Sequence, residues 1–442
     1  MSKPLVAIIG RPNAGKSTLF NRMVGGRRAI VEAVEGVTRD RNYADAEWEG
    51  KNFIVVDTGG FYPEAAAGIF PEAKEQALFA AQEADLIIHL LDARQGLTPA
   101  DLEMAGMLRA SGKKVLWAAN KIDAPTREDL LTDFFRIGEE VLPVSAATGY
   151  MFEEFMEKLA AMLPEAPPPG HGPGADMPKI AVVGRPNVGK STFINSLLGK
   201  KRLVVTSVAG TTRDAIDVVC TYYGKKYLFI DTAGIRRKFL SVGAYPLERF
   251  SMVMAYRSIE RSDVAVVLMD ASEGIVSDDQ KIAGLVHEGG KGAVFVLNKW
   301  DLVPDPEDAY KRLRKELARK LWFFSHAPVL AASGLERKAI TKIFPLIDGV
   351  LAERRKTVPA GELDGLMDEI ARDQKLRLPV YRGRKVRVYS IRQIGKEPPV
   401  FALNTSEPAG LKERDLKYFE RRLRERFHFA GTPVKVVPKR KK

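Results

Sequence analysis

The stretch GRPNAGKST at residues 10–18 recurs, with one substitution, as GRPNVGKST at residues 184–192. Each copy follows a short apolar run, so a strand is expected before it and a helix after it. In a Gly-x-x-x-x-Gly-Lys-Ser turn the glycines let consecutive backbone amides converge on a phosphate, and the helix directs its positive end at the same anion. Pro12 and Pro186 stand where the dinucleotide-binding fingerprint needs a glycine. The stretch therefore predicts two phosphate-binding loops, each opening an α/β domain.

The repeat extends well beyond the two loops. A constant offset of 174 relates Gly10, Lys16, Thr38, Arg39, Asp40, Asp57 and Gly60 to Gly184, Lys190, Thr212, Arg213, Asp214, Asp231 and Gly234. An offset of 178 relates Asn120, Lys121 and Asp123 to Asn298, Lys299 and Asp301. Apolar runs lie at 5–9, 53–57, 85–92, 114–120 and 141–145, and again at 179–184, 227–231, 264–270, 293–298 and 328–332. Such runs are typical of buried parallel strands, which predicts two tandem doubly wound α/β domains.

Composition suggests where the domains begin and end. We expect the first P-loop domain at 1–163, a Pro/Gly-rich linker at 164–178 and the second P-loop domain at 179–351. A small α+β domain is expected at 352–437, with helices over 363–373 and 411–427 and strands over 385–394, 398–404 and 432–438. The basic tail 438–442 is expected to be disordered.

Charge is concentrated at the end of the chain. Residues 351–442 hold 24 Lys/Arg and 12 Asp/Glu, a net charge of +12, whereas the whole chain carries +13. A basic domain favours a polyanionic partner, although a solvated basic surface is the plain alternative. The single cysteine, Cys220, and the lack of a long apolar stretch predict a cytoplasmic protein without a membrane segment.

Two kinds of side chain in each P-loop domain complete a nucleotide site. Lys16 and Lys190 are expected at the β- and γ-phosphates. Asp123 and Asp301, in the strings NKID and NKWD, offer acceptor oxygens that match the N1–H and 2-amino donors of guanine. Adenine has neither donor and would leave the carboxylate unpaired, so the base is predicted to be guanine.

A magnesium ion is expected beside each triphosphate. Its ligands, direct or through water, are predicted to be Ser17, Thr38 and Asp57 in the first domain and Ser191, Thr212 and Asp231 in the second. The two threonines would bind the metal only when a γ-phosphate is present, which makes their segments order–disorder switches. The amides of Gly60 and Gly234 are expected to meet the γ-phosphate.

The full set of expected nucleotide-binding residues follows from these motifs. In the first domain they are Gly10, Arg11, Pro12, Asn13, Ala14, Gly15, Lys16, Ser17, Thr18, Thr38, Asp57, Thr58, Gly59, Gly60, Phe61, Asn120, Lys121, Ile122, Asp123, Ser145 and Ala146. In the second domain they are Gly184, Arg185, Pro186, Asn187, Val188, Gly189, Lys190, Ser191, Thr192, Thr212, Asp231, Thr232, Ala233, Gly234, Ile235, Asn298, Lys299, Trp300, Asp301, Ala331 and Ala332.

Two such G domains followed by a small basic domain resemble the bacterial ribosome-assembly GTPases of the Der (EngA) family, within the TrmE-Era-EngA-like group. The resemblance covers essentially the whole chain. It implies GTP hydrolysis coupled to maturation of the large (50S) ribosomal subunit, rRNA as a partner, a KH-like C-terminal domain and a monomer. Phe61 and Ile235 replace a water-orienting glutamine. The resemblance suggests K⁺ at the β–γ bridge instead, held by Asn13 and Asn187; the alternative is that these asparagines only brace the loop.

The sequence also predicts the residues that contact guanine O6 and those of the C-terminal domain that bind RNA. Ser145-Ala146-Ala147 is aligned with Leu330-Ala331-Ala332, so the amide of Ala146 or Ala331 is expected at guanine O6 and the second copy lacks the serine. The C-terminal domain lacks the Gly-x-x-Gly loop of ordinary KH modules. Its candidate RNA-binding residues are Arg382, Arg384, Lys385, Arg387, Arg421, Arg422, Arg424 and Arg426.

Three functions remain open from the sequence. The first is a GTP-hydrolysing switch whose domain packing alters its affinity for a ribosomal precursor. The second is a GTP-gated RNA-binding scaffold in which hydrolysis is incidental. The third is an RNA-modification enzyme with a GTPase module, against which no cofactor-binding segment or catalytic cysteine constellation remains outside the two G domains. His89, inside an apolar run, is expected to be a hydrogen-bonded core histidine.

Overall fold

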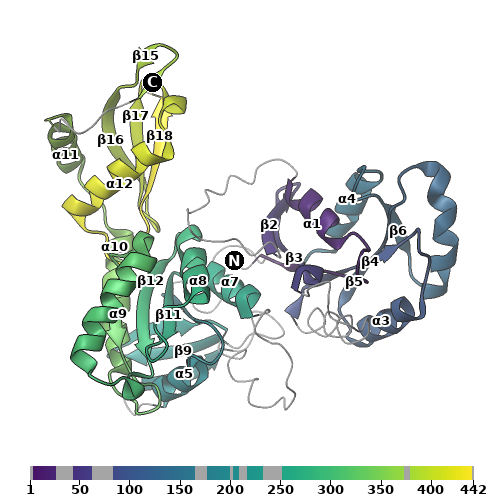
Figure 1. Ribbon diagram of the computed structural model, residues 1–442, viewed down its shortest axis with the longest axis horizontal. Helices are drawn as coiled ribbons and strands as arrows, with labels where there is room; N and C mark the ends of the chain where they lie inside the picture. The colour runs from purple at the N-terminus through teal and green to yellow at the C-terminus, as the bar shows by residue number, and fades with distance from the viewer. Residues whose placement is uncertain are drawn as a thin grey trace. The chain divides into compact units, whose positions relative to one another are not determined.

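A computed structural model describes residues 3–25, 43–61, 83–164, 177–199, 203–208, 217–231, 251–372 and 379–440 (Figure 1). It contains two compact units, one holding the described residues up to 164 and the other holding those from 177 onward. Within these ranges no helix is both long and apolar enough to cross a bilayer.

The first unit is a six-stranded sheet in the order β2-β3-β1-β4-β5-β6. Its strands are β1 (Leu5–Ile9), β2 (Tyr43–Trp48), β3 (Lys51–Asp57), β4 (Leu86–Asp92), β5 (Lys114–Asn120) and β6 (Val141–Val144). All neighbours are parallel except β2, which runs antiparallel to β3 at the edge. The five apolar runs predicted as strands are confirmed, because a sheet covered on both faces needs strands that are apolar on both sides.

Helices cover both faces of this first sheet. One hydrophobic cluster includes side chains of α1 (Lys16–Gly25) and α4 (Phe152–Met162) packed on alternate residues of the central strands. A second cluster packs α3 (Pro99–Ala110) and the 3₁₀ segment η2 (Pro125–Ile137) against the other residues of the same strands. Another 3₁₀ turn, η1 (Thr58–Phe61), follows β3. The carboxyl ends of β1, β3 and β5 therefore meet along one edge.

The second G domain repeats this plan with seven strands in the order β13-β12-β11-β7-β10-β9-β8. They are β7 (Lys179–Val183), β8 (Leu203–Val208), β9 (Asp217–Tyr222), β10 (Lys225–Phe229), β11 (Val264–Asp270), β12 (Gly292–Asn298) and β13 (Val329–Ala331). Its helices are α5 (Lys190–Leu198), α7 (Ser251–Arg261), α8 (Ser277–Glu288), α9 (Pro306–Lys320) and α10 (Ile343–Arg355), with 3₁₀ turns η3 (Trp300–Leu302), η4 (Trp322–Phe324) and η5 (Ile340–Lys342). The doubly wound prediction is confirmed for both domains.

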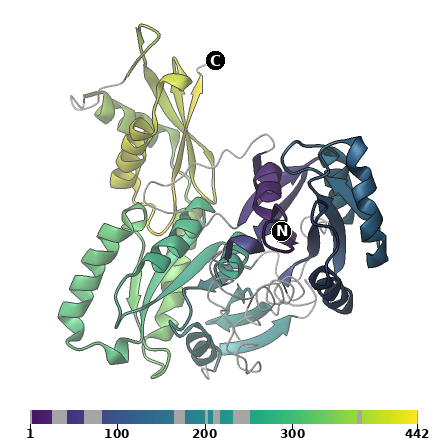
Figure 2. The same ribbon diagram turned by 45° about the vertical axis from the view of Figure 1, so that its right-hand side comes forward.

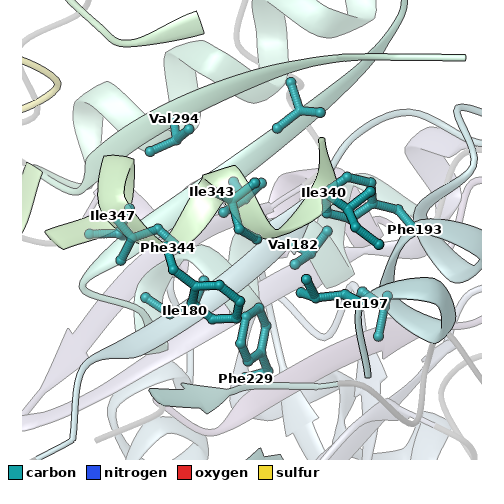
Figure 3. Close-up of a cluster of buried hydrophobic side chains, with 14 of the residues drawn as sticks. Ile180, Val182, Phe193, Leu197, Phe229, Val294, Ile340, Ile343, Phe344 and Ile347 are labelled. Carbon is teal, nitrogen blue, oxygen red and sulfur yellow. The ribbon is translucent and has the colours of Figure 1, made fainter. Parts of the chain in front are cut away.

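The core of the second G domain lies between its sheet and two helices. Side chains of α5 and α10 point onto alternate residues of β7, β10 and β12 (Figure 3). Phe344 of α10 stacks on Tyr222 at 4.3 Å between ring centroids and contacts Tyr227 at 5.0 Å. On the opposite face Phe295 of β12 packs against Phe324, which contacts His287 of α8. Each face of the sheet is thus covered, as the apolar strands require.

The C-terminal domain is a three-stranded sheet, in the order β16-β17-β18, with two helices on one face (Figure 2). Its elements are α11 (Ala360–Arg372), β14 (Val380–Tyr381), β15 (Arg384–Lys385), β16 (Val388–Gly395), β17 (Val400–Thr405), η6 (Pro408–Gly410), α12 (Glu413–Phe427) and β18 (Lys435–Arg440). Phe419, Leu423 and Phe427 of α12 lie in its core. Their spacing of four residues places them on one face of the helix.

Three sequence-based boundaries need correction. The expected strand 385–394 is two elements, because Val386 turns into the core between β15 and β16. The expected tail 438–442 begins inside β18, since Pro438, Lys439 and Arg440 pair with β17. The expected boundary between 351 and 352 falls within helix α10, which continues to Arg355. Residues 165–176 of the linker lie outside the described residues.

The second G domain and the C-terminal domain share backbone hydrogen bonds. The amide of Ala293 at the start of β12 donates to the carbonyl of Gly431 at 2.7 Å, and the amide of Gly431 donates to the carbonyl of His326 at 3.3 Å. Gly431 has φ 68°, and a Cβ there would lie 2.5 Å from Val350, so only glycine fits. Burial lowers the pKa of His326 to about 3, which keeps this junction histidine neutral.

Candidate functional site

Both P-loops fold in the same way around their lysine. Lys16 Nζ donates to the carbonyls of Gly10 and Arg11 at 2.8 and 2.7 Å, and Lys190 Nζ makes the two equivalent bonds at 2.7 Å each. Gly10 has φ 152° and lies so close to the Leu90 carbonyl that a Cβ would overlap it. The ammonium group therefore lies inside the turn, beside the amides expected to bind phosphate.

The asparagine of each NKxD string ties the base loop to the P-loop. Asn120 Nδ2 donates to the carbonyl of Ala14 at 2.8 Å, and Asn298 Nδ2 donates to the carbonyl of Val188 at 2.7 Å. The lysine after it forms an ion pair with the aspartate that ends the neighbouring strand, at 2.5 Å for Lys121 with Asp92. The second domain has the same pair at 2.6 Å. The structure thus brings together the phosphate loop and the base loop in each domain.

The carboxylate predicted to bind guanine lies at the edge of the first site. Asp123 Oδ1 accepts a hydrogen bond from Ser145 Oγ at 2.7 Å, and Asp123 Oδ2 accepts one from Arg94 Nη2 at 2.7 Å. The Ser145 hydroxyl and then the Arg94 guanidinium hold the pKa of Asp123 below its usual value. The carboxylate is therefore ionised at neutral pH, as an acceptor of two guanine donors must be.

The alignment of the second base loop with Leu330-Ala331-Ala332 was wrong. The amide of Gly334 donates to Asn298 Oδ1 at 3.0 Å, as the amide of Ala146 donates to Asn120 Oδ1 at 2.9 Å. The amide three residues after each serine donates to its hydroxyl, Thr148 to Ser145 and Glu336 to Ser333, at 3.0 Å in both cases. Ser333 and Gly334 thus occupy the positions of Ser145 and Ala146, and the serine is present in both copies.

Two of the three expected magnesium ligands of the first domain, Ser17 and Asp57, lie together. Ser17 Oγ donates to Asp57 Oδ2 at 2.5 Å, and the amide of Gly59 donates to Asp57 Oδ1 at 2.9 Å. A hydroxyl and a carboxylate beside the P-loop are the hard oxygen donors that Mg²⁺ prefers, so the residues fit the metal. In the second domain Asp231 Oδ2 accepts from Ser258 Oγ at 2.9 Å, and burial raises the pKa of Asp231.

Several predicted residues cannot be placed. Thr38, Thr212, Thr232, Ala233, Gly234 and Ile235 lie outside the described residues, and of Gly60 and Phe61 only the backbone is described. Asn13 and Asn187 both have φ 63°, a left-handed conformation that asparagine adopts more readily than most residues. Neither side chain forms a hydrogen bond within the described part of the chain. Their amide oxygens are thus available to a cation, while their backbone gives an independent reason for asparagine.

Sequence reasoning missed the partners of the P-loop arginines. Arg11 Nε donates to Asp101 Oδ1 at 2.9 Å, and the other oxygen of Asp101 accepts from Thr98 in a capping box at the start of α3. The Thr-x-x-Asp spacing could have identified this carboxylate. In the second domain Arg185 Nε is 3.6 Å from Asp279, whose pKa burial raises to about 6.

The histidine expected to be a hydrogen-bonded core residue is buried but not hydrogen-bonded. Both ring nitrogens of His89 lack a partner within the described residues, and the ring meets Trp117 edge-on at 5.2 Å. Burial lowers the pKa of His89 to about 4, so the ring is neutral. Neutrality removes the cost of burying a charge, whereas the two unpaired ring nitrogens remain unfavourable for the fold.

The eight candidate RNA-binding residues fall into two groups. Arg382, Arg384, Lys385 and Arg387, in and after the β14–β15 hairpin, are exposed, and none forms an ion pair with another described residue. The arginines of α12 are paired: Arg421 and Arg422 with Glu425, Arg424 with Glu420, and Arg426 with Glu369. Arg424 is also partly buried and donates to the carbonyl of Phe429, which indicates a role in the fold.

Comparison with known families gives two matches. The profile described as "50S ribosome-binding GTPase" matches residues 5–121 and again 179–299. The profile described as "KH-domain-like of EngA bacterial GTPase enzymes, C-terminal" matches residues 357–439. The matches cover both G domains and the small C-terminal domain.

Full-length relatives agree with these matches. GTPase Der of Thermodesulfovibrio yellowstonii is 47% identical over 450 residues, covering 99% of this chain and 99% of that protein. GTPase Der of Moorella thermoacetica is 42% identical over 441 residues, covering 100% and 99%. Among solved structures, Era in complex with MgGDPNP and nucleotides 1506–1542 of 16S ribosomal RNA is 22% identical, with a TM-score of 0.31 over 60% of this chain and 92% of that one. We draw nothing from that likeness, because its TM-score is low.

Proposed function

The chain belongs to the Der family of GTPases and hydrolyses GTP, and from this premise we propose that it acts as a switch in the assembly and maturation of the large (50S) ribosomal subunit. It would bind GTP at two sites and act as a cytoplasmic monomer on rRNA of the subunit or its precursor. The observation that carries the proposal is the pairing of two G domains, each matched by the profile of 50S ribosome-binding GTPases, with a KH-like domain that has unpaired cations.

We propose that equivalent residues have the same roles in the two nucleotide sites. The P-loop amides and Lys16 or Lys190 bind the phosphates, and Asp123 or Asp301 selects guanine. Mg²⁺ would be held by Ser17 and Asp57 in the first domain, together with Thr38, and by Ser191, Thr212 and Asp231 in the second. The metal supplies charge neutralisation at the β- and γ-phosphates. The contact to guanine O6 is proposed for the amide of Ala146 in the first site. In the second site it is proposed for the amide of Gly334 instead of Ala331, because Gly334 contacts Asn298 as Ala146 contacts Asn120.

Potassium is proposed to assist hydrolysis through the P-loop asparagines. GTP turnover is expected to be faster in K⁺ than in Na⁺ of equal concentration. Asn187→Gly keeps the left-handed backbone that φ 63° requires but removes the amide oxygen. Turnover by this variant should lose the K⁺ dependence while GDP binding stays within a few-fold of wild type, and Asn13→Gly gives the matched comparison at the other site. Equal turnover of the wild-type protein in the two cations would exclude the assignment.

The rRNA contact is proposed for the hairpin rather than for α12. Four cations without carboxylate partners lie within six residues there, whereas the α12 arginines already share glutamates. Arg382 lies 5.4 Å from the Tyr381 ring centroid, and Tyr389 is 44% exposed two residues past Arg387. An exposed aromatic ring such as that of Tyr389, close in sequence to these cations, suits stacking on unpaired bases, and the cations suit phosphate contact.

Sedimentation of cell extract tests the proposed function. The protein is expected to migrate with 50S particles or their precursors, with a distribution that differs between GDP and a GTP analogue. Replacing the four hairpin cations by alanine should abolish co-sedimentation and lower the slope of log affinity against log salt by roughly 3, about 0.7 for each lost phosphate contact. Arg421→Ala with Arg426→Ala removes two exposed but paired cations and should leave both measurements nearly unchanged. Migration of the wild-type protein free of ribosomal particles in both nucleotide states would refute the proposal.

A further inference from the structure

The two base-binding carboxylates differ in their neighbours. In the first site both oxygens of Asp123 already accept hydrogen bonds, from Ser145 Oγ and from Arg94 Nη2, each at 2.7 Å. A second guanidinium, that of Arg127, lies 3.5 Å from the same Oδ2 atom. The Asp123 side chain is 24% exposed and that of Arg94 is 56% exposed. The pair therefore lies at the mouth of the site, where the arginine can swing into solvent.

Among the described residues of the second site, no arginine pairs with the equivalent carboxylate, Asp301. The offset of 178 that relates Asp92 to Asp270 places Ser272 at the position of Arg94. Ser272 Oγ donates to Asp270 Oδ1 at 2.6 Å and is thus directed at a different carboxylate. Asp301 is exposed and forms no hydrogen bond or ion pair with another residue of the described chain. Lys338 lies near enough to interact electrostatically with Asp301 but forms its ion pair with Glu336 at 2.7 Å.

We propose that Arg94 competes with guanine for Asp123 and so sets the affinity of the first site below that of the second. The inference rests on the proposed role of Asp123 as the base-selecting carboxylate. Guanine presents two donors side by side, which need an acceptor position on each carboxylate oxygen, and Oδ2 already accepts from the guanidinium. Binding at the first site must break the arginine pair, whereas binding at the second breaks no protein contact. Arg94 is thereby an affinity-determining residue for the first site.

Salt concentration separates this competition from a general charge effect. The Arg94–Asp123 pair is half exposed and is weakened by screening. The affinity gained on removing Arg94 should therefore shrink as salt rises. If Arg94 instead attracted the nucleotide phosphates from a distance, its removal would lower affinity, and most strongly at low salt.

Calorimetry with Mg·GDP on the full-length protein tests the proposal site by site. The Asp301→Asn background is used so that tight GDP binding is confined to the first site. In this background Arg94→Ser is expected to bind GDP about 2- to 5-fold more tightly than the Asp301→Asn parent, because an exposed ion pair is modest in strength. Arg94→Lys, which keeps the cation, should stay near the parent. In an Asp123→Asn background Ser272→Arg should weaken the second site by a similar factor. An unchanged or weaker Arg94→Ser would overturn the inference.

The same set of variants distinguishes the inference from its premise. If Asp123→Asn alone leaves GDP affinity at the first site intact, then Asp123 does not select the base and the proposed function fails at that point. If Asp123→Asn abolishes tight GDP binding but Arg94→Ser has no effect, the base assignment stands and only the competition by Arg94 is wrong.

Discussion

Asp301→Asn is expected to weaken GTP and GDP binding at the second site by about 10²- to 10⁴-fold and to create a preference for xanthosine nucleotides there. The carboxylate offers only acceptors to the N1–H and 2-amino groups of guanine, whereas an amide faces one of these donors with its own NH₂ group. Xanthine has a carbonyl oxygen in place of the 2-amino group and can accept from that NH₂. Because Asp301 is exposed, its substitution is not expected to impair folding, so a loss of GDP affinity would report on the base contact.

The matching variant at the first site provides the control. Asp123→Asn should change the nucleotide preference of the first site and leave the second site unaltered, because the two carboxylates belong to separate units. Calorimetric titration of each variant with GDP and with xanthosine diphosphate gives two stoichiometries and two affinities. GDP affinity that is unchanged in both variants would contradict the assignment of guanine to these aspartates.

Phe344→Ala is expected to lower the free energy of unfolding of the second G domain by about 3–5 kcal/mol. The ring is 1% exposed and contacts three other rings, those of Tyr222, Tyr227 and Phe229. Figure 3 shows Phe344 pointing from α10 toward Phe229, so truncation would leave a cavity between helix and sheet. Hydrogen exchange of the β10 amides, followed by mass spectrometry without nucleotide, should accelerate about 10²- to 10⁴-fold.

Leu335→Ala is the matched control for this prediction. Leu335 belongs to the same domain but is 74% exposed, so its truncation should change the free energy of unfolding by no more than about 0.5 kcal/mol. Similar exchange rates in Phe344→Ala and Leu335→Ala would show that α10 does not stabilise the sheet in the way its contacts indicate.

The strands, the P-loops and the NKxD strings were predictable because their signals are local. A buried parallel strand must be apolar on both faces, and a P-loop needs its glycines and lysine within nine consecutive residues. The constant offset between the copies extended this inference to Asp57 and Asp231 without knowledge of contacts.

The constant offset failed to align the two copies where the connections between their strands differ in length. Ser145 follows Asp123 by 22 residues, whereas Ser333 follows Asp301 by 32 because the intervening chain folds into α9 and η4. Matching by apolar pattern therefore selected Ala331 and Ala332, three residues too early. The hydrogen bonds from Gly334 to Asn298 and from Glu336 to Ser333 identify the true register of the loop. The same limit applies to the end of β18, whose basic residues join the sheet through backbone pairing.

The sequence by itself determined that this protein has two G domains, each with a P-loop and an NKxD string, since these motifs depend on residues close together in the chain. Only the tertiary structure decided which distant side chains meet those residues: Arg94 on Asp123, Asp101 on Arg11 and Ser258 on Asp231. These contacts depend on how long connections fold back over the sheet, and no local pattern specifies that geometry. The different surroundings of two sites built from nearly the same motif therefore arise from packing around the motif.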